Sequence, residues 1–347
     1  MTLLFITQKM DRHDSLLGAY HGWVIELATH FEKILVICLE EGEHTLPENV
    51  EVYSLGKEHG AQSRAVYAFR FLSLAWKLRA QYDRVFVHMN QEYILLAGPL
   101  WRFLKKPIYL WRNHYAGSLG TDIAAFFCKN VFCTSSHSYT ARYKRTILMP
   151  VGVDTARFFP DETVSREDRS ILFLARIAPS KRLDIFIEAL GLLLSKSVSF
   201  VASVYGSPLP EHEFYYQNLQ TRAEALGLHN RVRFYPGVPN EKVPDIFRRH
   251  EIFVNCSPSG MFDKTIFEAA ASGCLILASS EDFRNATSTA FQFETAAGLA
   301  DNLQLLLSVN EKTRGEYRAT LDMLVHDNAL TALGLKLFDI INPRATL

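Results

Sequence analysis

Two cations in the second half of the chain have a spacing that could bind an anion. Arg176 and Lys181 lie five residues apart in "ARIAPSKRLD", directly after the apolar run "ILFLA". A turn of this length can bring both side chains to one point at a strand end, where a helix N-terminus adds partial positive charge. Such a point suits a diphosphate. The alternative is a solvated basic loop.

A second loop of this kind is "SGMFDKTIFEAAASGC", residues 259–274, which lies between the strand-like runs "EIFVN" and "CLILAS". Three residues are expected to present backbone N–H groups at the mouth of the following helix, as a second anion cradle: Gly260, Met261 and Phe262. Glu268 follows about one turn into that helix. Its carboxylate can accept two hydrogen bonds from a vicinal diol, such as the ribose of a nucleotide. The alternative is an ordinary glutamate favoured by the helix dipole.

The remaining candidates allow a plainer interpretation as well. Asp263 and Lys264 are either part of the charged turn or a local surface pair. Gly206 and Gly237 end strand-like runs, either because backbone passes close to a ligand there or because they are turn glycines.

The first half of the chain offers weaker candidates for a functional site. Gly18 and Gly22 bracket the start of the first expected helix. His88 ends a strand-like run, and His114 follows another in "LWRNHYAG". A single histidine at a strand end is usually structural, but two at the same edge of one sheet favour a ligand-binding role.

These residues need elements that bring them together, and the hydrophobic pattern supplies them. Short apolar runs alternate with helical stretches, which indicates parallel strands buried on both faces. The runs are 2–7, 33–39, 84–88, 107–111, 130–135, 146–152, 171–175, 198–206, 231–235, 251–255 and 274–279. A polar segment, Asp154 to Ser170, breaks the rhythm as a linker. The sequence therefore predicts two doubly wound α/β domains, residues 1–155 and 156–328, with ligands beyond the carboxyl ends of the strands.

Composition excludes several classes of protein. The 347 residues carry 37 Lys and Arg against 37 Asp and Glu, so no general attraction to nucleic acid is expected. Residues 1–160 hold 18 basic against 14 acidic side chains, a small excess that would suit anionic partners but is also compatible with chance. The five cysteines form no CxxC pair and predict buried free thiols in a reducing compartment. The histidines show no metal-binding spacing, and we expect no signal peptide or transmembrane segment.

One stretch could contact a membrane. Ser63 to Ala80, "SRAVYAFRFLSLAWKLRA", has no acidic side chain, and Ser63, Arg70, Ser73 and Lys77 share one helical face. Such a helix could lie in an anionic interface. The alternative is a helix packed on the sheet with its few charges in solvent.

Beyond these patterns, three stretches resemble a known family: "LMPVGVDTARFFP", "ILFLARIAPSKRLDIFIEAL" and the long run from "VRFYPG" to "CLILAS". They are similar to the retaining GT-B glycosyltransferases of the family 4 (group 1) type. This resemblance runs through nearly all of residues 150–280. It implies two Rossmann-like domains, with the nucleotide sugar on the C-terminal domain and the acceptor on the N-terminal one. It also implies that a last helix, within 329–347, returns to the first domain.

The resemblance assigns roles to several residues. Arg176 and Lys181 match the pair that neutralises the leaving diphosphate, in place of a metal ion. Glu268 matches the ribose-binding glutamate, and Gly237 with Val238 matches the loop that frames the base. In the first domain, His114 matches a histidine that reaches the donor sugar. Gly18 falls in the loop that approaches the diphosphate, although the usual pair of adjacent glycines is absent. His88 is assigned to the side of the first domain that binds the acceptor.

The sequence departs from the family at one position. The family has two glutamates eight residues apart, and counting back from Glu268 reaches Gly260. The carboxylate that contacts the donor sugar is therefore missing, and Asp263 is a candidate replacement. Gly206, Met261, Phe262 and Lys264 complete the expected donor site.

The expected activity is transfer of a hexose-type sugar from a nucleotide-diphosphate sugar to a hydroxyl of a glycan or lipid-linked acceptor, with retention and without cofactor or metal. The protein is expected in the cytoplasm. One interpretation adds peripheral contact with the inner face of the membrane. The alternatives are an inactive relative that binds a glycan or protein partner, a nucleotide-sugar epimerase, and a phosphorylase, for which no pyridoxal phosphate site is evident.

Overall fold

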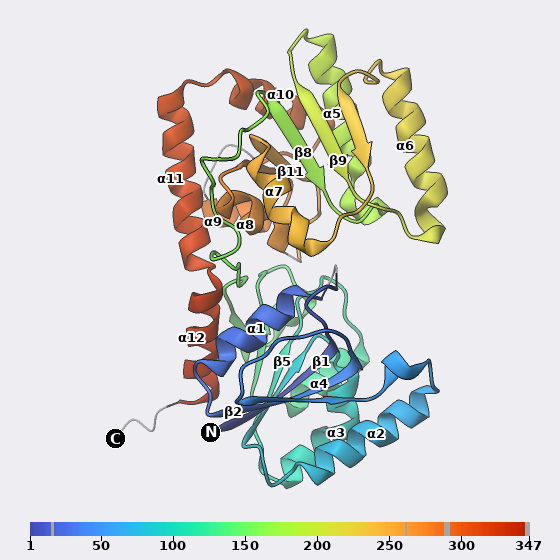
Figure 1. Ribbon diagram of the computed structural model, residues 1–347, viewed down its shortest axis with the longest axis vertical. Helices are drawn as coiled ribbons and strands as arrows, with labels where there is room; N and C mark the ends of the chain where they lie inside the picture. The colour runs from blue at the N-terminus through green and yellow to red at the C-terminus, as the bar shows by residue number, and fades with distance from the viewer. Residues whose placement is uncertain (15–16, 261, 288–291, 344–347) are drawn as a thin grey trace. The chain divides into compact units, whose positions relative to one another are not determined.

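The computed structural model describes residues 1–14, 17–260, 262–287 and 292–343. Its chain divides into two compact units, each built around its own sheet (Figure 1). Unit 1 comprises Met1–Gly152 together with the chain from Leu330 onward, and unit 2 comprises Val153–Ala329. The helix that follows residue 329 is thus part of unit 1. The boundaries predicted from the sequence lie at residues 155 and 328, close to those of the two units.

Unit 1 contains a seven-stranded sheet in the order β3-β2-β1-β4-β5-β6-β7. Every neighbouring pair is parallel. The strands are β1 (Thr2–Met10), β2 (Lys33–Glu41), β3 (Val50–Ser54), β4 (Arg84–His88), β5 (Ile108–Trp111), β6 (Asn130–Cys133) and β7 (Thr146–Leu148). Parallel neighbours require crossover connections, and helices supply most of them.

Both faces of this sheet are buried, as the continuous apolar runs predicted. Along β1, Leu4 and Ile6 enter one core while Leu3 and Phe5 enter the other, because successive side chains of a strand point to opposite faces. Helices α1 (Ala19–Ala28) and α12 (Leu330–Ile341) cover the second core.

Three helices cover the first core, and they lie side by side (Figure 1). They are α2 (Arg64–Lys77), α3 (Glu92–Phe103) and α4 (Leu119–Phe127). Ser63 caps α2 with its side chain, and Ser118 and Thr121 form a capping box at α4. Phe71 and Ala75 of α2 are buried, so this helix packs on the sheet. This agrees with the second interpretation of Ser63 to Ala80, a helix packed on the sheet with its few charges in solvent.

Unit 2 contains a five-stranded sheet of entirely parallel pairs, in the order β10-β9-β8-β11-β12. The strands are β8 (Ser170–Leu174), β9 (Val201–Tyr205), β10 (Val232–Tyr235), β11 (Ile252–Asn255) and β12 (Leu275–Ala278). With the strand order of unit 1, this order confirms the prediction of two doubly wound, Rossmann-like α/β domains.

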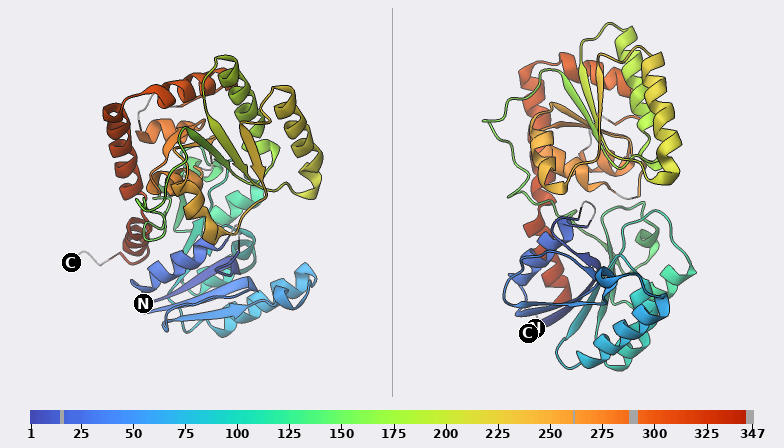
Figure 2. Two further views of the ribbon diagram at one scale, coloured as in Figure 1. Left: turned by 45° about the horizontal axis from the view of Figure 1, so that its top comes forward. Right: turned by 45° about the vertical axis from the view of Figure 1, so that its right-hand side comes forward.

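Two groups of helices pack in unit 2 (Figure 2). In one group α5 packs against α6 and α10, and in the other α8 packs against α7 and α11. Their bounds are α5 (Leu183–Ser195), α6 (Glu213–Ala225), α7 (Val243–Arg248), α8 (Lys264–Ala271), α9 (Glu281–Thr287), α10 (Ala296–Ser308) and α11 (Glu311–Asp327). Short 3-10 turns occupy Lys57–His59, Tyr139–Arg142, Pro179–Lys181, Pro210–His212 and Asn240–Lys242.

The structure adds a strand that the apolar pattern missed. Strand β3 lies at the edge of its sheet, and all five of its residues are only partly buried, so its sequence "VEVYS" carries no continuous apolar run. The thiols follow the prediction, because all five cysteines are described, buried and not joined in disulfides. Among the described residues, no helix is both long and apolar enough to cross a bilayer.

The packing of α12 in unit 1 can be tested with two leucines of the same helix. Leu337 is fully buried, whereas Leu335 is 53% exposed. We expect Leu337→Ala to lower the free energy of unfolding by about 2–5 kcal/mol, since it removes core contacts and leaves a cavity. Leu335→Ala should change it by less than about 0.5 kcal/mol. Chemical denaturation measures both, and equal effects would contradict the observed packing.

Candidate functional site

The strand order of unit 2 reverses between β8 and β11, which are neighbours in the sheet. Chain connections leave these two strands in opposite directions, and in such sheets ligands bind in the crevice beyond the carboxyl ends at this point. The loop after β8 carries Arg176 and Lys181, and the loop after β11 carries Asp263. The two loops singled out from the sequence therefore start side by side.

Lys181 and Asp263 join these loops directly. The Nζ atom of Lys181 lies 2.5 Å from Oδ2 of Asp263 and 3.1 Å from Oγ of Ser257. The same carboxylate oxygen accepts hydrogen bonds from Ser257 Oγ at 2.8 Å and Asn255 Nδ2 at 3.3 Å. One cation and two neutral donors thus converge on one carboxylate.

This environment keeps Asp263 ionised. Burial by itself would raise the pKa of the carboxyl, but the charge of Lys181 and the hydrogen bonds from Lys181, Ser257 and Asn255 outweigh it, so the pKa lies below its ordinary value. Without a bound anion, the charge of Lys181 is thus already compensated. An incoming phosphate would share this lysine with Asp263.

The pairing also changes the start of α8. Asp263 occupies the N-cap position, yet its side chain makes no capping bond, because the carboxylate is turned toward Lys181. Lys264 pairs instead with Glu268 in the next turn, with Nζ 3.6 Å from Oε1. Asp263 and Lys264 therefore have separate partners. Glu268 is only 7% exposed, and this burial raises the pKa of its carboxyl.

Arg176 differs from Lys181 in its surroundings. Its side chain is exposed at the end of β8. Within the described ranges, no hydrogen bond or ion pair reaches its guanidinium group. Since Lys181 and Lys264 both face carboxylates, Arg176 is the cation of this edge whose charge remains available to a ligand.

The loop before α8 departs from the expected anion cradle. The N–H of Gly260 is buried and donates to Oδ2 of Asp282 at 3.0 Å, so it is not open to a phosphate. Gly260 has φ +105°, a left-handed conformation that favours glycine. Phe262 is buried and packs edge-on against Phe267. Met261 lies outside the described residues.

The strand-end glycines have different neighbours. A Cβ atom on Gly206 would lie 2.0 Å from the carbonyl oxygen of Ala175, so glycine is required there by contact between two backbone segments. Gly237 is exposed, and its N–H donates to Ser207 Oγ at 2.9 Å. Val238 beside it is half-buried. Only the Gly237 turn is therefore accessible to a ligand.

In unit 1, His88 is a core residue at the end of β4. It has no exposed surface, its Nδ1 lies 3.1 Å from Thr7 Oγ1, and its ring packs 3.9 Å from that of Tyr20. Burial lowers the pKa of His88 to about 3, so the ring is neutral. An acceptor could not touch this side chain without rearrangement. The burial therefore favours a structural role for His88 over a role in binding the acceptor.

His114 is better placed for contact with a ligand. It is half-buried in the loop after β5, and its Nδ1 lies 2.9 Å from the backbone nitrogen of Ala116. The same Nδ1 lies 3.2 Å from the carbonyl oxygen of Ala116. In the tautomer that accepts the Ala116 N–H, Nε2 carries the ring proton and can donate it to a ligand. Gly18 is buried at the start of α1, and a Cβ there would lie 2.6 Å from the carbonyl oxygen of Asp14.

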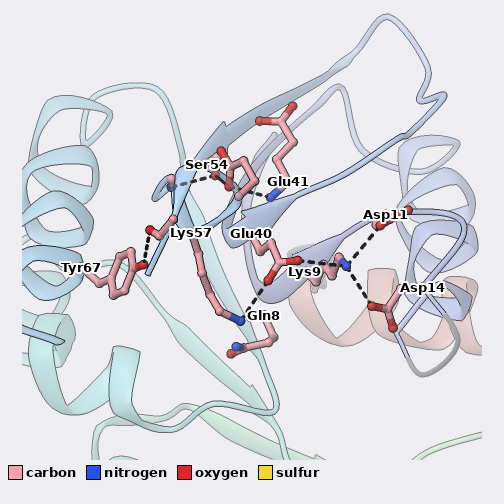
Figure 3. Close-up of polar contacts among 12 residues, drawn as sticks. Gln8, Lys9, Asp11, Asp14, Glu40, Glu41, Ser54, Lys57 and Tyr67 are labelled. Carbon is pink, nitrogen blue, oxygen red and sulfur yellow. Dashed lines mark hydrogen bonds and ion pairs between the residues drawn. The ribbon is translucent and has the colours of Figure 1, made fainter. Parts of the chain in front are cut away.

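A charged network at the carboxyl ends of β1 and β2 was not identified from the sequence (Figure 3). Nζ of Lys9 lies 3.0 Å from Glu40, 3.1 Å from Asp14 and 3.3 Å from Asp11. Lys57 approaches Glu40 to 2.9 Å from the other side. The carboxylate of Glu40, with Asp14 and Asp11, raises the pKa of Lys9 despite burial. This network fixes the loop that follows β1.

Sequence reasoning missed Asn255, Ser257 and Asp282 in unit 2. Asn255 and Ser257 offered a signal, since both are polar residues at the end of a buried strand. Asp282 offered none, because only the fold brings it to Gly260. Within the part of the chain that the structure describes, no group of three or more His, Cys, Asp and Glu side chains is arranged to hold a metal ion.

Comparison with known proteins adds to this geometry. Residues 154–312 match the family model described as Glycosyl transferases group 1. Mannosylfructose-phosphate synthase of Agrobacterium fabrum is 32% identical over 147 residues, which cover 39% of this chain and 32% of that protein. Lipopolysaccharide core biosynthesis mannosyltransferase LpcC of Rhizobium leguminosarum is 27% identical over 218 residues, 59% of this chain and 61% of that protein. The chain thus aligns with about a third of the first relative's length.

Similarity of fold extends over the whole chain. The structure of Anabaena HepE in complex with UDP and glucose has a TM-score of 0.78 at 16% identity, and the alignment covers 99% of this chain and 100% of that one. Sucrose-phosphate synthase from Thermosynechococcus elongatus has a TM-score of 0.73 at 13% identity, with 98% of both chains covered. The fold is therefore GT-B, as the sequence predicted.

The Lys181–Asp263 pair predicts a pH-dependent stability. The lowered pKa means that Asp263 stabilises the protein above its ordinary pKa of 3.8, and this contribution is lost as the pH falls. In Lys181→Met the buried carboxylate loses its cation, so its pKa should rise. The free energy of unfolding should drop by about 2 kcal/mol near neutral pH.

Denaturation from neutral to about pH 3 checks this result. The loss should shrink as the pH falls, because the carboxyl with the raised pKa in Lys181→Met is protonated first and ceases to be a buried, unpaired charge. Lys196→Met is the matched control, since its partner Asp301 is 68% exposed. It should cost less than about 0.5 kcal/mol. A Lys181→Met effect of equal size at both pH values would show that this ion pair does not set the pKa of Asp263.

Proposed function

We propose that this chain is a glycosyltransferase of the group 1 type that transfers a hexose-type sugar from a nucleotide-diphosphate sugar to a hydroxyl acceptor. One observation carries the proposal. Arg176, Lys181 and Asp263 gather at the strand-order reversal of unit 2, within the segment that matches the family model. This is where an α/β sheet binds a nucleotide.

The leaving group explains why cations are needed there. As the glycosidic bond breaks, negative charge grows on the nucleotide diphosphate while the sugar approaches an oxocarbenium ion. Fixed positive charge near the phosphates stabilises that transition state. Arg176 would supply most of this charge because it is free of carboxylate partners among the described residues, and Lys181 would add to it as phosphate displaces Asp263.

Glu268 and Asp263 have distinct parts in the proposal. Glu268 would bind the ribose, and Lys264, which lies 3.6 Å away, would orient it. Asp263 would face the donor sugar and replace the carboxylate absent at Gly260. Gly237 and Val238 would frame the base, and His114 would offer its Nε2 proton to a sugar oxygen.

We further propose that the configuration at the anomeric carbon is retained and that no metal takes part. The leaving phosphate would accept the proton of the acceptor hydroxyl on the same face of the sugar, so that no protein nucleophile is required. A uridine or guanosine diphosphate hexose is the first donor to test. The HepE structure holds UDP and glucose, and LpcC is named a mannosyltransferase.

One observation favours a second candidate, a relative that binds a glycan or protein without catalysis. Gly260 lacks the family carboxylate, and its N–H is taken by Asp282. The transferase, the epimerase and the binding module differ in what happens to the nucleotide sugar. An enzyme consumes nucleotide sugar when acceptor is present, an epimerase converts it without acceptor, and a binding module leaves it unchanged.

The first experiment is a thermal-shift panel with UDP, GDP, ADP, CMP and their sugar conjugates, with and without EDTA. A ligand that binds the folded state raises the melting temperature by mass action. We expect a shift with one diphosphate that EDTA leaves unchanged. A shift abolished by EDTA would overturn the metal-independent proposal, and no shift with any compound would favour the binding module.

We predict that Arg176→Ala and Lys181→Ala each lower kcat by about 100-fold to 1,000-fold, since each removes charge stabilisation of the leaving group. Lys312→Ala, which removes an exposed cation from α11 of the same unit, is the matched control and should keep normal turnover. Turnover of a radiolabelled donor, with melting temperatures measured in parallel, provides the test. Near-normal rates in both site variants would refute the diphosphate assignment.

A further inference from the structure

Helix α4 is apolar on both of its sides. Ala124 and Ala125 are buried against the sheet. On the opposite side, Leu119 is 75% exposed, Ile123 45% and Phe126 61%. These three residues are spaced by four and three positions, so they form one stripe along the helix. A helix that is apolar all round is normally buried on every side, and here one full side is open.

The neighbouring helix α3 continues this surface. Phe103 is 81% exposed, and Leu95 and Leu96 are also exposed. Leu95 lies against Gly120 of α4, within 3.4 Å of where a Cβ would stand, and the guanidinium of Arg102 lies 5.3 Å from the ring centre of Phe126. Helices α3 and α4 pack side by side (Figure 1), and these contacts place the two stripes next to each other. We call them together the α3–α4 face: Leu95, Leu96, Phe103, Leu119, Ile123 and Phe126.

The charge around this face is predominantly positive. Residues 61–131 contain 10 Lys and Arg and only 3 Asp and Glu. Of the acids, Asp122 is paired with Arg142 at 2.5 Å, and Asp83 accepts the N–H of Thr2. The third, Glu92, is at the far end of α3. Exposed cations stand at the C-terminal ends of both helices: Arg102, Lys105 and Lys129.

We propose that the α3–α4 face docks on a membrane surface that contains anionic lipids. Aromatic and aliphatic side chains would enter the boundary between headgroups and acyl chains, while the cations at its rim would meet lipid phosphates. Both contributions are on this face: large exposed apolar side chains and uncompensated positive charge. This binding would be peripheral.

A second copy of the chain fits this face less well. In a two-fold interface the same surface meets itself. The cations at the rim, Arg102, Lys105 and Lys129, would then lie in two facing sets without acidic partners on this surface, and like charges brought together oppose association. An anionic lipid surface has the complementary charge.

The position of α4 connects this face with the candidate site of unit 1. Ser118, which caps α4, ends the loop that carries His114, and Tyr115 of this loop is exposed and stacks on the His114 ring at 4.5 Å. An acceptor held in the membrane would thus meet His114 at one end of the face. This consequence rests on the proposed function, whereas the membrane binding itself does not.

Co-sedimentation of the full chain with phosphatidylcholine vesicles, with and without phosphatidylglycerol, tests the proposal. We expect binding that depends on the anionic lipid and weakens with salt. The double variant Phe103→Ser/Phe126→Ser should bind about tenfold more weakly. The triple variant Arg102→Gln/Lys105→Gln/Lys129→Gln should lose about fivefold per charge removed. Phe214→Ser, which alters a phenylalanine in unit 2 that is 74% exposed, is the control and should bind normally.

Three results would overturn the proposal. The first is no binding to anionic vesicles. The second is binding that both face variants leave unchanged while their melting temperatures stay normal. The third is a dimer in sedimentation equilibrium that Phe103→Ser/Phe126→Ser dissociates, which would identify the face as an interface between copies. Because vesicle binding needs no donor, these outcomes are separate from failure of the transferase assay.

Discussion

Every strand in both sheets runs parallel to its neighbours, and this constraint arranges the remainder of each unit. Parallel strands need connections that cross a face of the sheet, so all carboxyl ends come to one edge and both faces are covered by helices. The loops that carry the candidate site residues all lie at this edge. Where the strand order reverses, between β8 and β11, two such loops start side by side, and in sheets of this kind a ligand binds at this point.

The ion pair of Lys181 and Asp263 sets the electrostatics of that edge. It links the loop after β8 to the start of α8, and it diverts the Asp263 carboxylate from its usual capping bond. Lys264 and Glu268 pair one turn further on. The edge therefore carries fewer cations without a carboxylate partner than its number of basic residues suggests. In the proposed function this has a consequence, since phosphate must compete with Asp263 for Lys181 while Arg176 is ready to bind.

Helices α3 and α4 of unit 1 cover the sheet with one side each, and their opposite sides are also apolar. Only one side of α4 needs to be apolar to bury Ala124 and Ala125, and the same holds for Ala97 and Trp101 of α3. The apolar side chains on the opposite sides contribute nothing to the core. A surface such as this is a liability in water, and a partner with apolar and anionic character accounts for it.

The sequence by itself determined the two doubly wound domains and most of their strands, because continuous apolar runs between helical stretches have few other solutions. It also singled out Arg176, Lys181, Asp263 and Glu268 as candidates, since ionisable residues in the segments that follow buried strands are conspicuous. It missed β3, whose partly buried edge position leaves a weak pattern. Only the tertiary structure decided the partners: Asp263 with Lys181, Gly260 with Asp282, and His88 sealed beneath Tyr20. Those contacts join residues on different elements, and burial and pairing at such a distance along the chain leave no periodic trace in the sequence.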